Sequence, residues 1–411
     1  MSFQQGLSGL NAASKSLEVI GNNVSNANTV GFKQSTTKFA DVYANSLSGS
    51  GGSQIGIGTK IAQVQQTFTQ GNITSTNNPL DIAINGGGFF RMSDNGSITY
   101  SRNGQFQLDK VGYIVNSDNK RLTGYTADAQ GVLSTGAAAE LNINTADLAP
   151  SATAAVTGTL NLDSRNTALS SAAFNANDPT TYHHSTSINV FDSLGNSHVL
   201  QSYFVKTAPG AWDLFTAVDG TTNGFTPPAT PVATAQITFG TSGANPTSVP
   251  AIPTITAPVT TGAAALSLTL DYSNNTQFGS TFSVNSLAQD GYSSGRLAGF
   301  SIGDDGTILG RYTNGQSATL GQVVLSNFTN PNGLESLGSN AWAESSVSGL
   351  PLTGTPNSGG LGVLQSLAVE DSNVDLTAEL VNMITAQRFY QANAQTIKTQ
   401  DQVLQTLVNL R

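Results

Sequence analysis

Apolar and polar side chains alternate in two different ways along the chain. Near both ends, apolar positions recur in steps of three and four, the spacing of a helix that packs on a partner helix. The first stripe consists of Phe3, Leu7, Leu10, Ser14, Leu17, Gly21 and Val24. The second consists of Leu376, Leu380, Met383, Gln387, Tyr390, Ala394, Ile397, Asp401, Leu404 and Val408. The pattern predicts one amphipathic helix at each end of the sequence.

Two such helices can lie antiparallel as a coiled-coil stalk. The later helix would reach about 50 Å at about 1.5 Å per residue, and the earlier one supplies only about 25 residues. The excess stripe needs a further surface, and the polar positions Ser14, Gly21, Gln387 and Asp401 weaken an isolated pair. We therefore expect packing that is completed by other copies of the chain. A closed helical hairpin within one chain is the alternative.

Polar signals place the helix ends. The asparagine-rich run at 22–28 competes with the helical backbone, and Gly31 is a suitable stop. Ser372 with Asp375 three residues later has the pattern of a capping box, in which both side chains bind exposed N–H groups. Glu379 adds negative charge near the positive end of the helix dipole. These signals predict a second helix that starts near residue 376.

Between the helices, short alternating apolar runs indicate β-structure. Five dipeptides predict tight turns with positive φ: Asn85-Gly86, Asn95-Gly96, Asn103-Gly104, Asp305-Gly306 and Asn314-Gly315. The sequence predicts a mainly β, nested multi-domain protein with α-helical termini. Its parts are a helical stalk (1–31 and 372–411), a connector (32–70 and 361–371), a β-rich body (71–145 and 285–360) and an inserted outer β-domain (146–284). Residues 46–58, rich in glycine and serine, indicate a linker within the connector.

Composition narrows the function. Only 10% of the residues are charged, against about 25% in ordinary soluble domains. A net charge of -9 argues against a nucleic-acid partner, and the apolar runs are too short to span a bilayer. The chain has no cysteine, which excludes disulfides and thiolate metal sites. The first residues lack the basic and apolar blocks of a secretory signal, so we expect no cleaved signal peptide.

Three clusters could carry chemistry, and each has a simpler reading. Gly86, Gly87 and Gly88 lack the lysine and the following helix of a phosphate-binding loop. His183 and His184 would point to opposite faces of a strand, and His198 follows a turn that begins at Asp192. Asp304-Asp305-Gly306 lacks the later ligands of a calcium loop. We expect turns at these places, and no catalytic, cofactor-binding or metal-binding residues.

Several stretches together resemble the bacterial flagellar rod and hook protein family. They are residues 17–33 (LEVIGNNVSNANTVGFK), 78–90 (NPLDIAINGGGFF), 100–106 (YSRNGQF) and the C-terminal 372–411, which contains ELVNMITAQRFYQANAQ at 379–395. The length, the large insert and the segments 191–198 and 321–334 favour the hook branch of that family. The motif residues on which the resemblance depends are Asn22, Asn23, Asn26, Gly31, Phe32, Asp81, Gly88, Phe89, Phe90, Arg102, Gly104 and Phe106.

The resemblance implies a structural subunit without enzymatic activity or cofactor. Such subunits form a curved tube, a flexible joint that transmits torque from the motor rod to the filament. The implied partners are other copies of the chain, the distal rod protein, the hook–filament junction protein, the hook cap and the flagellar type III export apparatus. The implied location is extracellular, in the flagellum, after export without cleavage. The apolar residues of the terminal stripes are then the expected assembly residues.

Other classes of protein share parts of this pattern. A distal-rod-type axial protein would have the same terminal motifs. A secreted adhesin or phage-tail fibre would share the polar β-composition but would not need matched stripes at both ends. A polysaccharide-cleaving enzyme would need paired carboxylates in a cleft, and the sequence shows no convincing pair.

Overall fold

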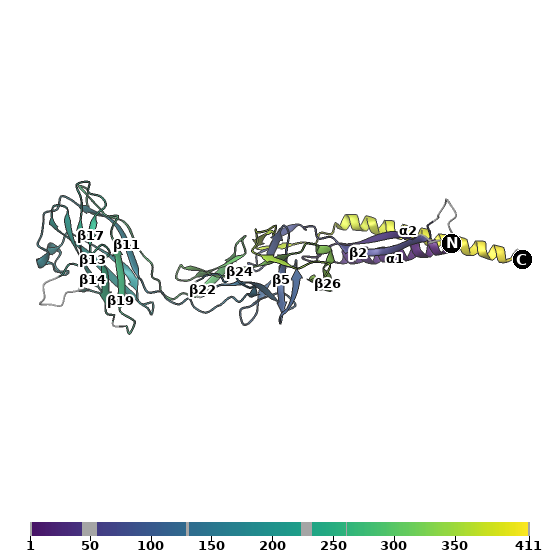
Figure 1. Ribbon diagram of the computed structural model, residues 1–411, viewed down its shortest axis with the longest axis horizontal. Helices are drawn as coiled ribbons and strands as arrows, with labels where there is room; N and C mark the ends of the chain where they lie inside the picture. Colours follow the sequence, from purple (N-terminus) through teal and green to yellow (C-terminus); the bar gives the residue numbers. More distant parts are fainter. Residues whose placement is uncertain (1, 43–55, 129–130, 223–231, 260, 410–411) are drawn as a thin grey trace. The chain divides into compact units, whose positions relative to one another are not determined.

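The chain folds into two compact units, one inserted into the other. The computed structural model describes residues 2–42, 56–128, 131–222, 232–259 and 261–409. Unit 1 comprises Met1–Asn144, Gly299–Gly310 and Ser317–Arg411, and unit 2 comprises Thr145–Ala298 and Arg311–Gln316 (Figure 1). The predicted mainly β fold with a helix at each end is confirmed. Most of the glycine- and serine-rich stretch at 46–58 lies outside the described residues.

The terminal segments of unit 1 form the two predicted helices. They are α1 (Ser2–Ser25) and α2 (Leu376–Asn409), and a hairpin of β1 (Ser35–Val42) and β2 (Gly58–Gln66) lies along them (Figure 1). The helix α1 ends within the asparagine run as predicted, and there the side-chain amide of Asn26 donates to the carbonyl of Asn22 at 2.9 Å. Gly31 then adopts a φ of 72°, a value that glycine adopts without a steric penalty.

The start of α2 differs from the predicted capping box. The Oδ1 of Asp375 accepts hydrogen bonds from the N–H groups of Thr377 and Ala378, at 2.9 and 3.1 Å, so Asp375 is itself the N-cap. The hydroxyl of Ser372 instead accepts from the N–H of Val374 and shapes the turn before the helix. The helix begins where predicted, but its cap lies three residues later than the box required.

The β-part of unit 1 is built on one large sheet. Among the described residues this sheet has thirteen strands, with the main order β22-β23-β24-β9-β5-β6-β27-β26. Its strands are β5 (Phe89–Asp94), β6 (Ser97–Ser101), β7 (Gln107–Leu108), β8 (Ile114–Val115), β9 (Arg121–Thr126), β10 (Ala139–Glu140), β22 (Leu297–Ile302), β23 (Thr307–Tyr312), β24 (Ser317–Val323), β25 (Leu325–Asn327), β26 (Glu335–Gly338), β27 (Ala341–Ala343) and β28 (Leu352–Gly354).

Two strand pairs join the start of this sheet region to the segment before α2. The antiparallel pairs are β3 (Ile73–Ser75) with β30 (Ala368–Glu370), and β4 (Ile82–Asn85) with β29 (Val363–Ser366). A short 3₁₀-helix, η3 (Pro331–Gly333), precedes β26. The pairs bring residues about 290 positions apart in sequence into register, so the two arms of the chain are tied together before α2 begins.

The turn predictions hold at some dipeptides and fail at others. Asn95 and Gly96 both have positive φ, 51° and 95°, and connect β5 to β6 as a two-residue hairpin loop. Asn103-Gly104 was expected to do the same, and that expectation is wrong. Neither residue has a positive φ, and a Cβ at Gly104 would collide with the carbonyl of Ile82. This glycine permits a close approach of two backbones instead of a turn.

Unit 2 consists of one antiparallel and one mixed sheet that share one core. One sheet has the order β18-β19-β11-β20 with β21 beside β11, and the other β12-β13-β14-β16-β17 with β15 beside β14. The strands are β11 (Ala155–Asp163), β12 (His184–Phe191), β13 (Ser197–Ala208), β14 (Ala211–Val218), β15 (Thr221–Thr222), β16 (Ala235–Thr238), β17 (Thr247–Val249), β18 (Thr254–Ala257), β19 (Leu266–Asp271), β20 (Thr276–Phe278) and β21 (Ser283–Gln289), with 3₁₀-turns at η1 (Ser171–Ala173) and η2 (Pro179–Thr181).

The core of unit 2 draws on both of its sheets. Leu160 of β11 and Leu268 of β19 meet Phe204 of β13 and Trp212 of β14 in a single buried cluster. Burial alternates along β19, as expected for a strand with one face on a core. Unit 2 is therefore a β-sandwich that can bury its own apolar surface.

A buried histidine closes one hairpin of unit 2. Residues 191–196 form the predicted turn between β12 and β13, and His198 lies beyond it between two carboxylates. Its Nδ1 is 2.6 Å from Asp219 and its Nε2 is 3.2 Å from Asp192. Burial alone lowers the pKa of His198, but the hydrogen bonds to Asp219 and Asp192 outweigh burial and raise it. The protonated imidazolium is thus favoured in the folded unit.

We predict that unit 2 loses stability as the pH rises above neutrality. A base with a raised pKa in the folded state contributes its full stabilisation below its unfolded value, about 6.5, and loses it as the pH passes the folded pKa. Unit 2 contains Trp212, so a Trp342→Phe background reports its unfolding by fluorescence. The denaturation midpoint should fall between about pH 6 and about pH 9.

Two histidine variants test the assignment. His198→Gln should abolish this fall, whereas His183→Gln should retain it, because burial lowers the pKa of His183 and gives it a dependence of the opposite sign. A midpoint that is flat with pH in the His198-containing protein would contradict the prediction.

Candidate functional site

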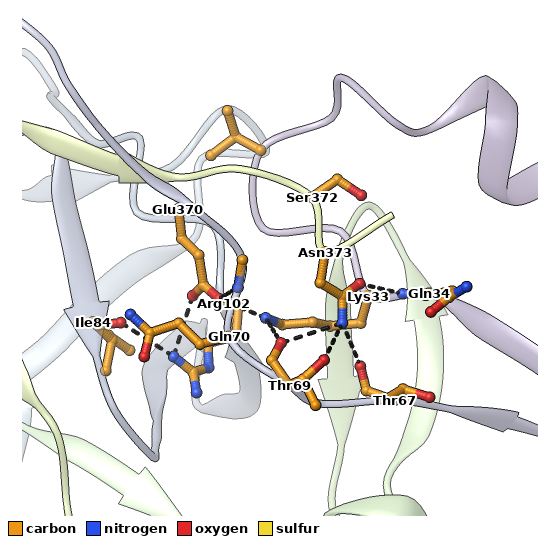
Figure 2. Close-up of polar contacts among 12 residues, drawn as sticks. Lys33, Gln34, Thr67, Thr69, Gln70, Ile84, Arg102, Glu370, Ser372 and Asn373 are labelled. Carbon is orange, nitrogen blue, oxygen red and sulfur yellow. Dashed lines mark hydrogen bonds and ion pairs between the residues drawn. The ribbon is translucent and has the colours of Figure 1, made fainter. Parts of the chain in front are cut away.

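A buried ion cluster lies where the two arms of unit 1 meet. Glu370, the last residue of β30, accepts a hydrogen bond from Nζ of Lys33 at 2.6 Å and from the N–H of Gly71 at 2.9 Å through Oε1. Its Oε2 accepts from Arg102 at 3.2 Å (Figure 2). The side chains of Lys33, Arg102 and Glu370 are 0%, 4% and 0% exposed. One carboxylate thus joins three segments that are far apart in the sequence.

Backbone oxygens balance the second positive charge of the cluster. Lys33 donates to the carbonyl of Thr69 at 2.8 Å, and Arg102 donates to the carbonyl of Gly86 at 2.7 Å. The Arg102 guanidinium also lies 5.5 Å from the centre of the Phe89 ring, whose face attracts cations. A cluster of two cations and one anion is acceptable in this interior because dipoles surround the excess charge.

Burial has measurable electrostatic consequences for the two cations. It lowers the pKa of Lys33, and the charge and hydrogen bond of Glu370 oppose that effect. Burial likewise lowers the pKa of Arg102, again against the influence of Glu370. The carboxylate is therefore the group that opposes the effect of burial on the pKa of both cations.

The residues that follow Glu370 bind the segment that comes directly after α1. Asn373 accepts from the N–H of Gln34 at 2.7 Å and donates to the carbonyl of Thr67 at 2.8 Å (Figure 2). The backbone N–H of Gly31 donates to the carbonyl of Glu370 at 2.7 Å. These contacts set the point at which α2 starts relative to the point at which α1 ends.

The β1–β2 hairpin is fixed to α1 by side chains of the helix. Asn23, 1% exposed, exchanges two hydrogen bonds with the backbone of Ser35, at 2.8 and 3.0 Å. The hydroxyl of Ser8 accepts from the N–H of Thr59 at 3.3 Å. The hairpin therefore accompanies the helix from its C-terminal end to its first turns.

The helices pack closely through small residues. A Cβ at Gly6 would lie 3.0 Å from Cγ1 of Ile397, and one at Gly9 would lie 2.5 Å from Oδ1 of Asn393. Later residues of α1 thus lie beside earlier residues of α2, so the predicted antiparallel arrangement is confirmed. Glycine at these positions allows the axes to approach each other, which larger side chains would prevent.

The face of α1 that is buried within the chain lies one residue before the predicted stripe. The buried residues are Gly6, Ala12, Ala13, Ile20 and Asn23. Of the predicted stripe, Phe3 and Leu7 are exposed and Leu10, Leu17 and Val24 are half-buried. On α2, Met383 and Ile397 are half-buried, and the exposed residues are Leu376, Leu380, Tyr390, Leu404 and Val408. The role of these residues in assembly stays a prediction.

The motif residues separate into a buried group and a surface group. Arg102 belongs to the ion cluster, and Gly31 lies so close to Asn103 that a Cβ there would be 2.6 Å from its backbone nitrogen. Phe90 packs edge-on against Phe106, with ring centres 5.1 Å apart. The other buried members are Asn23, Phe32, Asp81, Gly88, Phe89 and Gly104, while Asn22 and Asn26 remain at least partly exposed.

Sequence reasoning missed the partners of Arg102. Lys33 and Glu370 form the centre of the cluster, yet neither was expected to have a structural role. The available signal was their setting: in a chain with 10% charged residues, Lys33 follows Gly-Phe and Glu370 ends the apolar run Leu-Ala-Val. Isolated charges in apolar runs are candidates for buried pairing.

Metal-binding groups and membrane-spanning helices are two further kinds of feature that could add a function to the described residues. Within the described ranges, no three His, Cys, Asp or Glu side chains are grouped so that they could bind a metal ion. Among the same residues, neither helix combines the length and apolarity needed to cross a bilayer. The geometry of the ion cluster allows it to hold the two arms of the chain together.

We predict that Glu370→Gln lowers the free energy of unfolding of unit 1 by about 3–5 kcal/mol, because it leaves two buried cations without a counter-ion. Glu140→Gln is the matched control, since it breaks a partly exposed pair, Arg121–Glu140 at 2.6 Å. The control should cost less than about 1 kcal/mol. Denaturant unfolding followed through the fluorescence of Trp342 measures the free energy of unfolding of both variants. Equal decreases in the two variants would contradict the prediction that the buried cluster contributes more than the partly exposed pair.

Family models match four parts of the chain. They are "Flagella basal body rod protein" at residues 3–33, "Flagellar hook protein FlgE/F/G D1 domain" at 83–162, "Flagellar basal body protein FlaE D2 domain" at 161–292 and "Flagellar basal body rod FlgEFG protein C-terminal" at 365–410. The matches at both ends cover α1 and α2, and the two others cover parts of units 1 and 2.

Relatives match over the whole sequence. The chain is 44% identical over 416 residues to "Flagellar hook protein FlgE" of Salmonella typhimurium, covering 100% of both chains, and 42% identical to that of Escherichia coli with the same coverage. The crystal structure of Helicobacter pylori flagellar hook protein FlgE2 is similar in fold, with a TM-score of 0.52 at 14% identity, over 71% of this chain and 99% of that one. The chain belongs to the flagellar hook protein family.

Proposed function

We propose that this chain is the structural subunit of the flagellar hook and assembles with copies of itself into a curved tube that transmits torque. One observation carries the proposal: α2 packs on α1 with one side and leaves large apolar side chains exposed on the other. They include Leu380 at 45%, Val381 at 58% and Ile384 at 52%. A helix with apolar residues outside its internal contact requires a further partner.

The family supplies the identity of that partner. A subunit of a helical polymer meets identical copies on all sides, so apolar surface that is exposed in one chain becomes buried in the polymer. The proposed location is the extracellular part of the flagellum, reached through the flagellar type III export apparatus without cleavage. The further proposed partners are the distal rod protein, the hook–filament junction protein and the hook cap. The full-length likeness to hook proteins favours the hook subunit over the rod, adhesin and glycan-cleaving alternatives.

We also propose a division of mechanical roles. In this account the terminal helices, at 1–31 and 372–411, resist twist, and the β-domains bend by sliding past neighbouring copies. The low charge of the chain suits such sliding, because few ion pairs would have to be broken. The connector and body boundaries given above, at 32–70, 71–145, 285–360 and 361–371, are part of the same proposal.

We predict that Leu380→Asp prevents tube formation and leaves the monomer folded. The side chain is 45% exposed in the single chain, so the added charge stays in contact with water in the monomer and harms association. Gln391→Asp, an exposed polar position of the same helix, is the control and should still form tubes. Electron microscopy of concentrated protein measures assembly, and circular dichroism measures the monomer. Normal tubes from Leu380→Asp would count against the proposal.

Unit 2 can be removed at a defined place. Leu148 and Gly295 form an antiparallel β-bridge, so their backbones are adjacent and a two-residue Asn-Gly turn can join them. We predict that the shortened chain still polymerises but gives straight tubes, because bending contacts are lost and the helices are intact. Curved tubes from this chain would reject the division of roles.

A further inference from the structure

The two terminal helices differ in length, and α2 continues past the end of the helix pair. The contacts of Gly6 with Ile397 and of Gly9 with Asn393 fix the antiparallel register. At equal rise per residue, Ser2 lies opposite about residue 401. The helix α2 nevertheless runs to Asn409, and its end projects beyond the first turn of α1 (Figure 1). We call residues 402–409 the tail.

The apolar face of α2 continues along the tail. Met383, Tyr390, Ile397 and Leu404 are spaced by seven residues, so Leu404 lies on the same side as Ile397, which contacts α1. Leu404 is 54% exposed and Val408 is 73% exposed. The tail therefore presents a helix-packing face for which the described residues of its own chain offer no helix.

A groove runs along the same helix pair. It has a volume of about 550 Å³ and is bounded by α1, β1 and α2. The part of its α1 wall from Gly9 to Ser16 is made of small residues, and its rim on the other helix carries Phe389. Lining residues used below are Ala12, Ala13, Ser16, Thr385 and Phe389. Small side chains on one wall let a third helix approach closely.

Tail and groove match in charge and length. Residues 402–409 contain no charged side chain, and the groove's only ionisable lining residue, Glu379, is 3% exposed, so docking would desolvate little charge. The α1 wall from Gly9 to Asn23 spans about 21 Å, and the eight-residue tail spans about 12 Å. The tail cannot enter its own groove, because Leu404 and Phe389 are about 22 Å apart along one helix.

We propose that the tail of one copy docks in the groove of a second copy. The two surfaces differ, so the contact is of the head-to-tail kind, which generates an open helical polymer when its rotation does not close a ring. The inference rests on the proposed self-assembly and specifies one of its contacts. Leu404 and Val408 supply the buried side chains, and the small residues of α1 supply the surface that receives them.

Disulfide trapping tests the contact, because the chain has no cysteine of its own. The double variants Leu404→Cys/Phe389→Cys and Leu404→Cys/Thr385→Cys should give a ladder of linked multimers when oxidised tubes are run on a non-reducing gel. An intrachain bridge is impossible, since a disulfide requires Cα atoms within about 7 Å. Leu404→Cys/Gln391→Cys, whose second cysteine does not line the groove, should give no ladder.

A second variant decides the question if the cysteine pairs hinder assembly. Leu404→Asp should raise the critical concentration for tube formation at least tenfold and leave the helical content of the monomer unchanged. Thr406→Asp, on the opposite side of the tail, should leave that concentration unchanged. Tubes without a ladder from either groove pair, or an unchanged critical concentration for Leu404→Asp, overturn the inference alone. Failure of the unmodified protein to form tubes overturns the proposed function as well.

Discussion

The architecture of unit 1 depends on one carboxylate. Glu370 joins the segment after α1, the strand region around Arg102 and the strand that leads into α2, and no other residue touches all three of these chain segments through charged contacts in the described part of the protein. Because the interaction is buried, salt screens it much less than it screens a surface ion pair. This ion cluster fixes the end of α1 relative to the start of α2.

Small residues line the contact between the two helices whose starting points Glu370 helps to fix. Glu370 and Asn373 fix the starting points of α1 and α2, and the small residues Gly6, Gly9 and Ala13 let the two helices approach each other closely. The large apolar side chains are then available for the outer surface. The contact between α1 and α2 and the proposed contacts with other copies of the chain thus use different faces of the helices.

Much of the fold could be predicted from the sequence, but its long-range polar contacts could not. Periodicity and capping residues located both helices, because these signals are local. The phase of α1 was wrong by one residue, since a search for large apolar side chains finds the outward face of a helix whose inward face is glycine and alanine. The ion cluster was missed because its members, Lys33, Arg102 and Glu370, are brought together only by the fold.

The bridge between Leu148 and Gly295 has a consequence for the history of the chain. The polypeptide enters and leaves the sandwich at neighbouring points. The gene segment that codes for this part can therefore be lengthened, shortened or exchanged while the flanking parts of the polypeptide still fold. A change in the length of this inserted unit therefore leaves the strands on either side of the insertion point in place.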